Sequence, residues 1–587
     1  GRTGEKMMDK KSARFILIIV LIISFFMRIF YITKVNGPFV YTDELGYWGH
    51  AANLTGHNWA GVMNGMPWYA FGYSLLLSPF FFFAADTVFM YRMAVILNAV
   101  FGLLSLMIAY RLLCRMRTKY RDFSGTAVWA FTAVSFSAYI FNSYIAWSET
   151  LLAFLVWLIL YEFVVLEENP RLWKGFLLGA TAGYSYMVHN RMLAVVAAVL
   201  AITGFLLWKK RIRWSHLLCV AGSIAAVFLL QAVLKGCFRR ALAENSVLLA
   251  MGVHAEFGKA NTLTQQILKI GQVFTPEGFK KIVVNLCGQV WQVLSSTYLL
   301  AGMGIAYCVK RARDAVKEKE TVSLYLFPVT ALFFTVLMTA LFFVEDAGSG
   351  SGGPVRIDTF FYGRYNDVLQ GTLLAAALFM LCVRVREKVY YKMIPLVYLV
   401  YLLASGVMYL ALKNIEDFYL NIVSAESIHI FHWLGEFAVW KCVLIALAVS
   451  GVCLVFAYAK LPKAVNSYLI CGLLTALFFT TAFQCMRLSV RGENDYTQQY
   501  AEIFDYLNEN TETEEPVFIL ERGKFAYDLQ TRLADKMVIC IEEGQLRHVA
   551  DSQYLVMSEQ SYADFTHSEY TECLQAADYI ILQKKED

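Results

Sequence analysis

Charge is scarce in this chain of 587 residues. Only 17% of the residues are Asp, Glu, Lys or Arg, whereas 58% are hydrophobic. So little charge excludes an ordinary soluble globular protein and predicts a polytopic α-helical membrane protein. We therefore expect the lipid bilayer, and not nucleic acid, as its main partner.

Ordered cysteine spacing is also missing. The chain has twelve cysteines, but no CxxC or Cys/His pattern, which argues against a disulfide framework or a zinc site of those residues. Most of them stand inside apolar runs, where a buried free thiol is expected. The first apolar run lacks a small-residue cleavage site and so predicts an anchor, not a signal peptide. Residues 1–6, before Met7 and Met8, resemble a cloning remnant.

Apolar runs of about 20 residues predict membrane-spanning helices. We expect about thirteen, near 15–33, 89–113, 125–144, 147–166, 172–188, 191–208, 215–234, 283–308, 322–344, 366–383, 391–412, 437–459 and 466–486. The segment Tyr69–Ala85 is apolar too, but Gly72 and Pro79 interrupt it. We expect it to lie in the interface or to dip into it.

Lys and Arg in short loops indicate orientation. In a thirteen-span arrangement, every basic cluster falls on one side: at Lys10–Arg14, Arg115–Arg121, Arg171–Lys174, Lys209–Arg213, Lys310–Lys319, Arg384–Lys392 and Lys460–Lys463. This pattern predicts a multi-pass protein of the plasma (inner) membrane, with residues 1–14 in the cytoplasm and the C-terminus outside.

The outer side then holds four pieces: residues 34–88, 235–282, 345–365 and 487–587. The last has 9 Lys/Arg and 21 Asp/Glu, a net charge of −12. Its short apolar runs at 516–520, 537–541, 554–557 and 579–582 alternate with helix-compatible stretches, which predicts a small extracytoplasmic α/β domain after a transmembrane domain of residues 15–486. The Gly/Ser-rich segment Ala347–Pro354 predicts a flexible outer loop.

Two adjacent carboxylates, Asp43 and Glu44, follow the first apolar run in the stretch Tyr41–Trp48. Acidic residues at a membrane boundary usually face water, a metal or a reacting group. Further along come the stretch Gly72–Pro79, then Tyr91-Arg92 with Asn98 and Gly102, and then Ser148-Glu149-Thr150. In this order the motifs resemble the GT-C superfamily of integral-membrane glycosyltransferases, and more closely its protein mannosyltransferase and lipid A aminoarabinose transferase branch.

That resemblance implies a GT-C fold and an inverting glycosyltransferase. Such an enzyme moves a sugar from a polyprenyl-phosphate donor to an acceptor at the outer face, the acceptor being a glycan, a lipid or a protein. Asp43 holds the place of the family's general base, and Glu44 would orient the acceptor or assist the base. The aromatic side chains of Tyr47 and Trp48 are candidates for packing against the sugar, although such residues also concentrate at bilayer interfaces.

The leaving phosphate needs positive charge. Arg364 and Tyr365, in an outer loop before the tenth run, match an Arg-Tyr pair that the resemblance implies. Arg191 is the second candidate, with His189 beside it in a turn between two helices. Arg356 and Lys259 are weaker candidates for the same role.

Glu149 opens the fourth predicted span, where it either compensates the helix dipole or binds substrate or metal. Some branches of the resembled superfamily use a divalent cation, so a Mg, Mn, Ca or Zn ion held by Glu149 with Asp43 is one expectation and no cofactor is the other. Two other readings stay open: an O-antigen ligase or polymerase, and a transporter of lipid-linked glycans. The early acidic motif argues against the first, and the absence of an internal repeat argues against the second.

Overall fold

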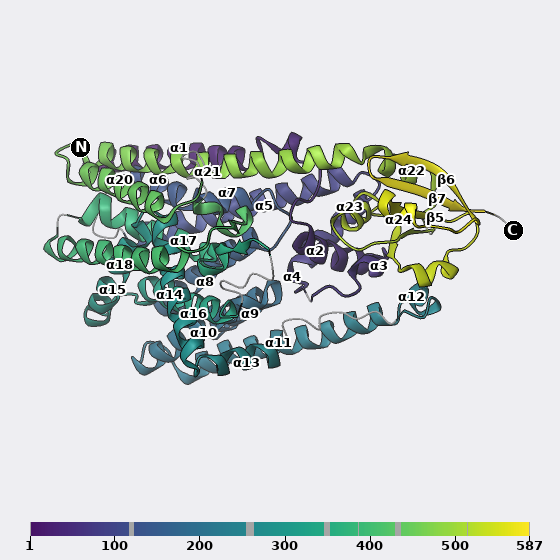
Figure 1. Cartoon of the computed structure of the whole chain (residues 1–587). Helices are drawn as coiled ribbons and strands as arrows, with labels where there is room; N and C mark the ends of the chain where they lie inside the picture. Colours follow the sequence, from purple (N-terminus) through teal and green to yellow (C-terminus); the bar gives the residue numbers. More distant parts are fainter. Residues whose placement is uncertain are drawn as a thin grey trace.

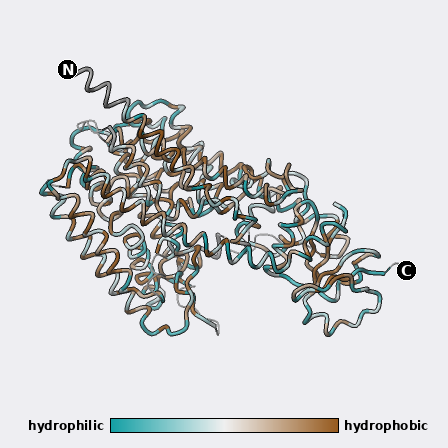
Figure 2. Tube along the Cα trace, turned by 90° about the horizontal axis from the view of Figure 1, so that it is seen from above, coloured by the Kyte–Doolittle hydropathy of each residue, from teal (hydrophilic) through white to brown (hydrophobic). Residues whose placement is uncertain are grey.

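The computed structural model describes residues 2–67, 69–116, 123–253, 263–345, 353–385, 387–428, 436–513 and 515–585. The molecule is elongated: α1 (Arg2–Ile29) begins at one end, and the C-terminal strands lie at the other (Figure 1). Hydrophobic residues run through the helical bundle, while hydrophilic ones gather in connecting loops (Figure 2).

Ten helices of the described segments are long and apolar enough to cross a membrane. They are α1, α5 (Thr87–Met116), α8 (Glu149–Glu168), α10 (Leu193–Trp208), α11 (Trp214–Ala243), α16 (Ser323–Phe342), α17 (Gly363–Phe379), α18 (Lys388–Leu412), α20 (Val439–Tyr458) and α21 (Lys463–Gln499). Every one of them coincides with a predicted run. The polytopic helical membrane protein expected from composition is therefore confirmed.

Three predicted spans look different in the structure. The run 125–144 forms α6 (Phe123–Val134) and α7 (Ser137–Asn142), and the run 172–188 forms α9 (Leu172–Val188), which has 17 residues. The run 283–308 divides into α14 (Pro276–Ser296) and α15 (Leu300–Glu318), bent by 102°. One continuous helix is wrong there because Tyr298 and Leu299 adopt left-handed backbone angles, with φ of 52° and 67°. The described chain thus has ten candidate spans, or eleven with the bent pair, instead of thirteen.

The segment predicted as the first outer loop, residues 34–88, consists mostly of short helices. It holds η1 (Ile32–Lys34), α2 (Tyr41–Leu54), α3 (Ala60–Met63), α4 (Gly72–Leu77) and η2 (Ser78–Phe83). The apolar segment Tyr69–Ala85 therefore forms two short elements. The remaining short elements of the helical part are η3 (Asn190–Met192), α12 (Ser246–Ala250), α13 (Leu263–Gln272), β1 (Val355–Arg356), η4 (Ile357–Phe360), η5 (Met380–Arg384), β2 (Phe418–Tyr419) and α19 (Ile422–Ala425).

The C-terminal domain is a five-stranded sheet with helices, as the alternating pattern predicts. Its strands are β3 (Pro516–Ile519), β4 (Met537–Cys540), β5 (Tyr554–Ser558), β6 (Tyr570–Ala576) and β7 (Tyr579–Lys584), in the order β4-β3-β5-β7-β6. Strands β4, β3 and β5 are parallel, and β7 and β6 run antiparallel. Helix α22 (Ala501–Asn510) precedes β3, and α23 (Lys524–Arg532), η7 (Glu543–His548) and α24 (Glu559–Ala563) stand between the strands. Helix α21 continues to Gln499, past residue 487 where composition changes.

The sheet domain packs against the segment of residues 36–61 that surrounds Asp43. The indole Nε1 of Trp59 donates to the carbonyl of Ala534 at 2.9 Å, and Arg532 Nη1 donates to the carbonyl of Asn36 at 2.8 Å. A Cβ at Gly61 would lie 2.3 Å from the carbonyl oxygen of Val538, so α3 packs closely on β4 only because residue 61 has no side chain. The loop that carries Asp43 is therefore braced by the C-terminal domain.

Candidate functional site

Asp43 lies in the first turn of α2, where a carboxylate interacts favourably with the helix dipole. Its Oδ1 accepts a hydrogen bond of 2.8 Å from the hydroxyl of Tyr69. Its Oδ2 accepts one from Nη1 of Arg364. Gly46, one turn after Asp43, makes room for Tyr69, because a Cβ at that position would lie 2.1 Å from the tyrosine ring.

Arg364 is the second residue of α17 and joins two acids. Besides Asp43, its Nε donates to Glu149 Oε1 at 2.6 Å, and the guanidinium stacks 3.9 Å above the ring of Trp147. Glu149 is the first residue of α8 and is buried. The predicted donor-binding arginine and the predicted second acid are thus direct partners.

Arg191 completes the network from the other side of Glu149. Its Nη2 donates to Glu149 Oε2, and its guanidinium carbon lies 4.7 Å from the ring centre of Tyr365. Only 6% of Arg191 is exposed, yet its Nε and Nη1 have no hydrogen-bond partner in the described structure. Two buried N–H groups of a cation are therefore available to a ligand.

The turn that carries Arg191 is fixed by its neighbours. His189 Nδ1 accepts from the backbone N–H of Arg191 at 3.2 Å, and the His189 ring meets Tyr365 edge-on at 6.0 Å. A Cβ at Gly72 would lie 2.8 Å from the backbone of Met187 and Val188, so α4 packs directly against the end of α9. Burial, followed by the charges of Arg191 and Arg364, holds the pKa of His189 well below its ordinary value, so this imidazole is neutral.

The four charged residues form an alternating chain of Asp43, Arg364, Glu149 and Arg191. Burial alone would raise the pKa of the Asp43 carboxyl. The Arg364 charge and the hydrogen bonds from Arg364 and Tyr69 outweigh burial and hold that pKa below its ordinary value. We call these four residues the charged network. It lies where α8, α10 and α17 begin, and helix N-termini attract anions.

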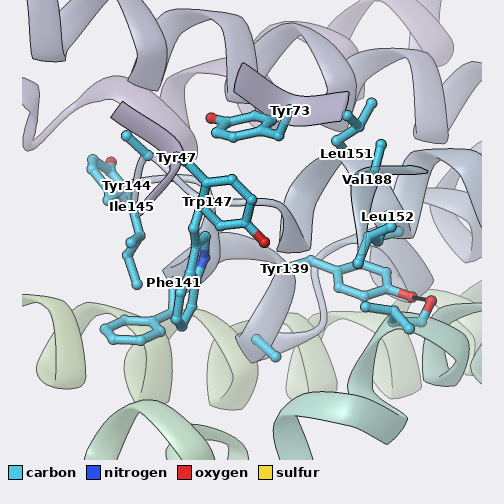
Figure 3. Packing of buried hydrophobic residues seen from close by; sticks show 14 of the residues in the cluster. Tyr47, Tyr73, Tyr139, Phe141, Tyr144, Ile145, Trp147, Leu151, Leu152 and Val188 are labelled. Carbon is cyan, nitrogen blue, oxygen red and sulfur yellow. Dashed lines mark hydrogen bonds between the residues drawn. The ribbon is translucent and has the colours of Figure 1, made fainter. Parts of the chain in front are cut away.

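Buried aromatic side chains underlie the network. Tyr47 donates to the Ser148 hydroxyl at 2.9 Å and packs edge-on against Tyr69 and Tyr73. Figure 3 shows Tyr47 and Trp147 within this core, with Tyr139 and Phe141 nearby. The structure thus brings seven predicted site residues into one region: Asp43, Tyr47, Glu149, His189, Arg191, Arg364 and Tyr365.

Glu44 points elsewhere. Its Oε2 accepts from the backbone N–H groups of Phe39 at 2.8 Å and Val40 at 2.7 Å. Its Oε1 accepts from the backbone N–H of Ala146 at 2.9 Å and from the hydroxyl of Tyr91. Burial raises the pKa of Glu44 to about 7 against these hydrogen bonds. These four donors tie the carboxylate to two backbone segments, at residues 39–40 and at Ala146, and to α5, so Glu44 holds these segments together and does not face the charged network.

Two further predicted residues, Trp48 and Arg356, lie apart from the network, and a third is not among the described residues. Trp48 is buried against Phe81 and Tyr91, in the core behind α2, so it has no exposed face for a sugar. Arg356 pairs with the buried Asp358, its Nη2 at 2.8 Å from Oδ2. Lys259 lies outside the described residues, as does most of the predicted loop Ala347–Pro354.

The sequence did not reveal the roles of two residues at the site, Tyr69 and Trp147. In the sequence, Tyr69 stands only at the start of the apolar segment expected in the interface, and Trp147 is not singled out. The signal for Trp147 was its position two residues before Glu149; none marked Tyr69, since its place depends on the empty space at Gly46. The motif residues around the site hold backbone: Arg92 Nε donates to Val35 O at 3.0 Å, and Asn98 Nδ2 donates to Ile145 O at 2.8 Å.

The predicted metal pair, Asp43 with Glu149, does not fit a cation as arranged. All four carboxylate oxygens already accept hydrogen bonds, from Tyr69, Arg364 and Arg191. The Arg364 guanidinium occupies the position between the two acids, and among the described residues no group of three His, Cys, Asp or Glu side chains could hold a metal ion. In this arrangement the positive charge between the acids comes from Arg364.

Solved structures with this architecture are known. Crystal structures of ArnT from Cupriavidus metallidurans, one in the apo state and one bound to undecaprenyl phosphate, each match with a TM-score of 0.50 and 13% sequence identity. The match covers 99% of this chain and 98% of that one.

The chain has the ArnT fold. This fold is the GT-C fold that the sequence motifs imply, and it accounts for both the helical bundle and the C-terminal sheet domain. No protein-family model matches the sequence, and no curated protein matches it either. The likeness to ArnT therefore concerns the fold.

Proposed function

We propose that this protein transfers a sugar from a polyprenyl-phosphate donor to a hydroxyl or amine of a glycan, lipid or protein acceptor, at the outer face of the membrane. The observation that carries the proposal is the charged network, in which the part-exposed Asp43 pairs with Arg364, and two buried arginines, Arg364 and Arg191, share Glu149. The undecaprenyl phosphate bound to ArnT supports a lipid-phosphate donor.

Asp43 is the proposed general base. Its side chain is 21% exposed, so an acceptor can reach it, and its low pKa keeps it ionised at neutral pH. In the reaction the acceptor oxygen or nitrogen bonds to the anomeric carbon, and its proton passes to Asp43. The bond between that carbon and the phosphate oxygen breaks, and its electron pair leaves with the lipid phosphate.

The two arginines are the proposed phosphate site. Arg191 offers Nε and Nη1, which have no partner among the described residues, and Arg364 stands at the N-terminus of α17. Both can stabilise the negative charge that develops on the leaving phosphate. Glu149 keeps the two guanidinium groups together, so its role is positioning.

The pairing of Asp43 with Arg364 determines the order in which donor and acceptor bind. A base that is bonded to a guanidinium is a weak proton acceptor. When the donor phosphate draws Arg364 toward itself, Asp43 loses part of that interaction and becomes more basic. Donor binding therefore precedes productive acceptor binding, and a single displacement inverts the anomeric centre.

The active face is proposed to be extracytoplasmic because the basic clusters of the sequence gather on the other side. A reporter that is active only in the cytoplasm, fused after Asp587, should then be silent. A fluorescent fusion of the same length, active on both sides, controls for expression.

The deciding experiment is a transfer assay with the purified protein in lipid. Undecaprenyl-phosphate sugars serve as donors, and release of undecaprenyl phosphate and the glycosylated product are measured by mass spectrometry. The acceptor is identified by comparing the envelope glycans of cells with and without the protein. Transfer that disappears in Asp43→Asn and in Arg364→Ala supports the proposal. Transfer at the parent rate in both variants would refute it.

A further inference from the structure

The C-terminal domain has a cleft of about 460 Å³ at the carboxyl ends of its parallel strands. Leu520, Glu521 and Arg522 follow β3, and Ile541, Glu542 and Glu543 follow β4. Ser561, Asp564 and Phe565, at and after α24, close the third side. None of the residues that line this cleft belongs to the charged network.

The cleft lies where sheets of this type bind ligands. From β3 the chain crosses to β4 on one side, and from β4 it crosses back to β5 on the other side. The strand order therefore reverses between β3 and β5, and ligands of open α/β sheets bind at such a reversal, beyond the carboxyl ends of the strands. The segments that follow β3 and β5 both contribute to the lining, the second through α24 and the residues after it.

The lining selects a class of ligand. Four carboxylates face one guanidinium, so a phosphate or another acidic group is disfavoured by charge. Carboxylates accept hydrogen bonds from hydroxyl and ammonium groups. Phe565 adds an aromatic surface, which stays fixed because its ring packs against Tyr570 at 5.5 Å and Tyr562 at 6.4 Å. A polyhydroxylated ring that is neutral or carries an amine fits these groups.

Arg522 joins the cleft to the loop of the charged network. Its Nη1 donates to the carbonyl of Asn64 at 2.9 Å. Five residues further along, Tyr69 donates to Asp43. Five residues of extended chain span at most about 18 Å. An acceptor of a few sugar rings can therefore reach from the cleft toward the site.

We propose that this cleft binds the acceptor as a saccharide of neutral or amine-bearing rings, and thereby holds it near Asp43. That the bound saccharide is the acceptor rests on the proposed transfer reaction. Binding of the saccharide itself is a separate property of the C-terminal domain.

The test measures binding by the full-length protein in nanodiscs, without donor. Three tetrasaccharide probes are compared: chitotetraose, which is neutral; its deacetylated form, which carries amines; and tetragalacturonate, which is acidic. We expect the first two to bind and the acidic one to bind at least tenfold more weakly. Phe565→Ala should weaken both binding probes by about tenfold, and Glu542→Gln/Glu543→Gln should weaken the amine-bearing probe more than the neutral one.

A matched control carries the same change of charge on the same domain. Glu502→Gln/Glu509→Gln alters two exposed acids of α22, away from the cleft, and should leave all three affinities unchanged. The proposal is overturned if none of the probes binds, if the acidic probe binds best, or if the cleft variants bind like the control. These outcomes are independent of the transfer assay, since an Asp43→Asn protein should bind the probes normally whether or not the parent transfers sugar.

Discussion

The two faces of helix α2 treat adjacent carboxylates in opposite ways. On one face Asp43 is part-exposed and meets a guanidinium and a phenol; on the other Glu44 is buried and meets three backbone N–H groups and a phenol. Asp43 has a lowered pKa and Glu44 a raised one. The comparison shows that neighbouring acids in one motif can have opposite settings: Asp43, the proposed base, is partly open to solvent, whereas Glu44 fixes the segment that carries it.

The largest effect should separate the two acids directly. Asp43→Asn removes the proposed base while keeping its size, so we expect kcat to fall by about 10²- to 10⁴-fold with little change in Tm. Glu44→Gln should do the reverse, because its amide donors would face the N–H groups that now donate to the carboxylate. That variant should lose about 1–3 kcal/mol of stability and keep kcat within threefold in the folded fraction. Steady-state transfer and thermal unfolding of both variants measure this. Equal loss of kcat in the two would break the division of roles.

The next prediction concerns Arg364, which joins Asp43 to Glu149. Arg364→Ala should lower transfer by about 10²- to 10³-fold, since it removes a phosphate donor group and leaves Asp43 and Glu149 without their shared partner. Arg364→Lys should retain partial activity, because one ammonium cannot reproduce the two simultaneous contacts.

The matched control is Arg356→Ala, whose guanidinium pairs with Asp358. We expect its donor KM to change by less than threefold even if Tm falls. A donor KM that rises as much in Arg356→Ala as in Arg364→Ala would mean that the outer loop acts as a whole and that Arg364 has no special part.

The pH dependence of stability should have opposite signs for the two acids. The folded pKa of Glu44 is raised, so its protonated form is favoured on folding and the parent should lose stability relative to Glu44→Gln as pH rises from about 4.5 to 7. The folded pKa of Asp43 is lowered, so the parent should lose stability relative to Asp43→Asn as pH falls below its ordinary value near 3.8. Each slope is at most about 1.4 kcal/mol per pH unit. Thermal unfolding from pH 3 to 8 measures both, and slopes of the same sign would contradict the assignment.

The smallest expected effect concerns the space beside Asp43. Gly46→Ala would push the Tyr69 ring away and cost the hydrogen bond to Asp43, which corresponds to about 1 kcal/mol, or a five- to tenfold lower kcat. Tyr69→Phe should cost a similar amount, and the double variant should be no worse than either single one. Gly204→Ala, in α10 with open space around it, is the control. Additive losses in the double variant would show that Gly46 acts by another route.

Sequence reasoning located the long helices well because apolar runs have a simple physical cause. It failed at Tyr298 and Leu299, since left-handed backbone angles in non-glycine residues leave no trace in hydropathy. It also missed the edge strand β6, whose polar and apolar residues do not alternate because a bulge between Glu572 and Leu574 shifts the register. Both failures come from tertiary packing overriding local composition.

At the candidate site, motifs identified the charged residues but not their partners. Asp43, Glu149, Arg191 and Arg364 each stood out as a charge beside an apolar run. That one guanidinium bridges two of the acids could not be read from residues separated by more than 200 positions. The stretch Tyr41–Trp48 does not tell which face of its helix is covered, so it could not show that α2 turns Glu44 and Trp48 toward the core.

Helix α21 has a mechanical consequence. Its 37 residues run without interruption from the bundle to the sheet domain, and such a helix is about 55 Å long. That exceeds the hydrocarbon thickness of a bilayer by about 25 Å. Because the helix is unbroken, it holds the sheet domain at a fixed distance from the helical bundle. The length of α21 would thereby set the distance from the bilayer at which the proposed saccharide cleft holds its ligand.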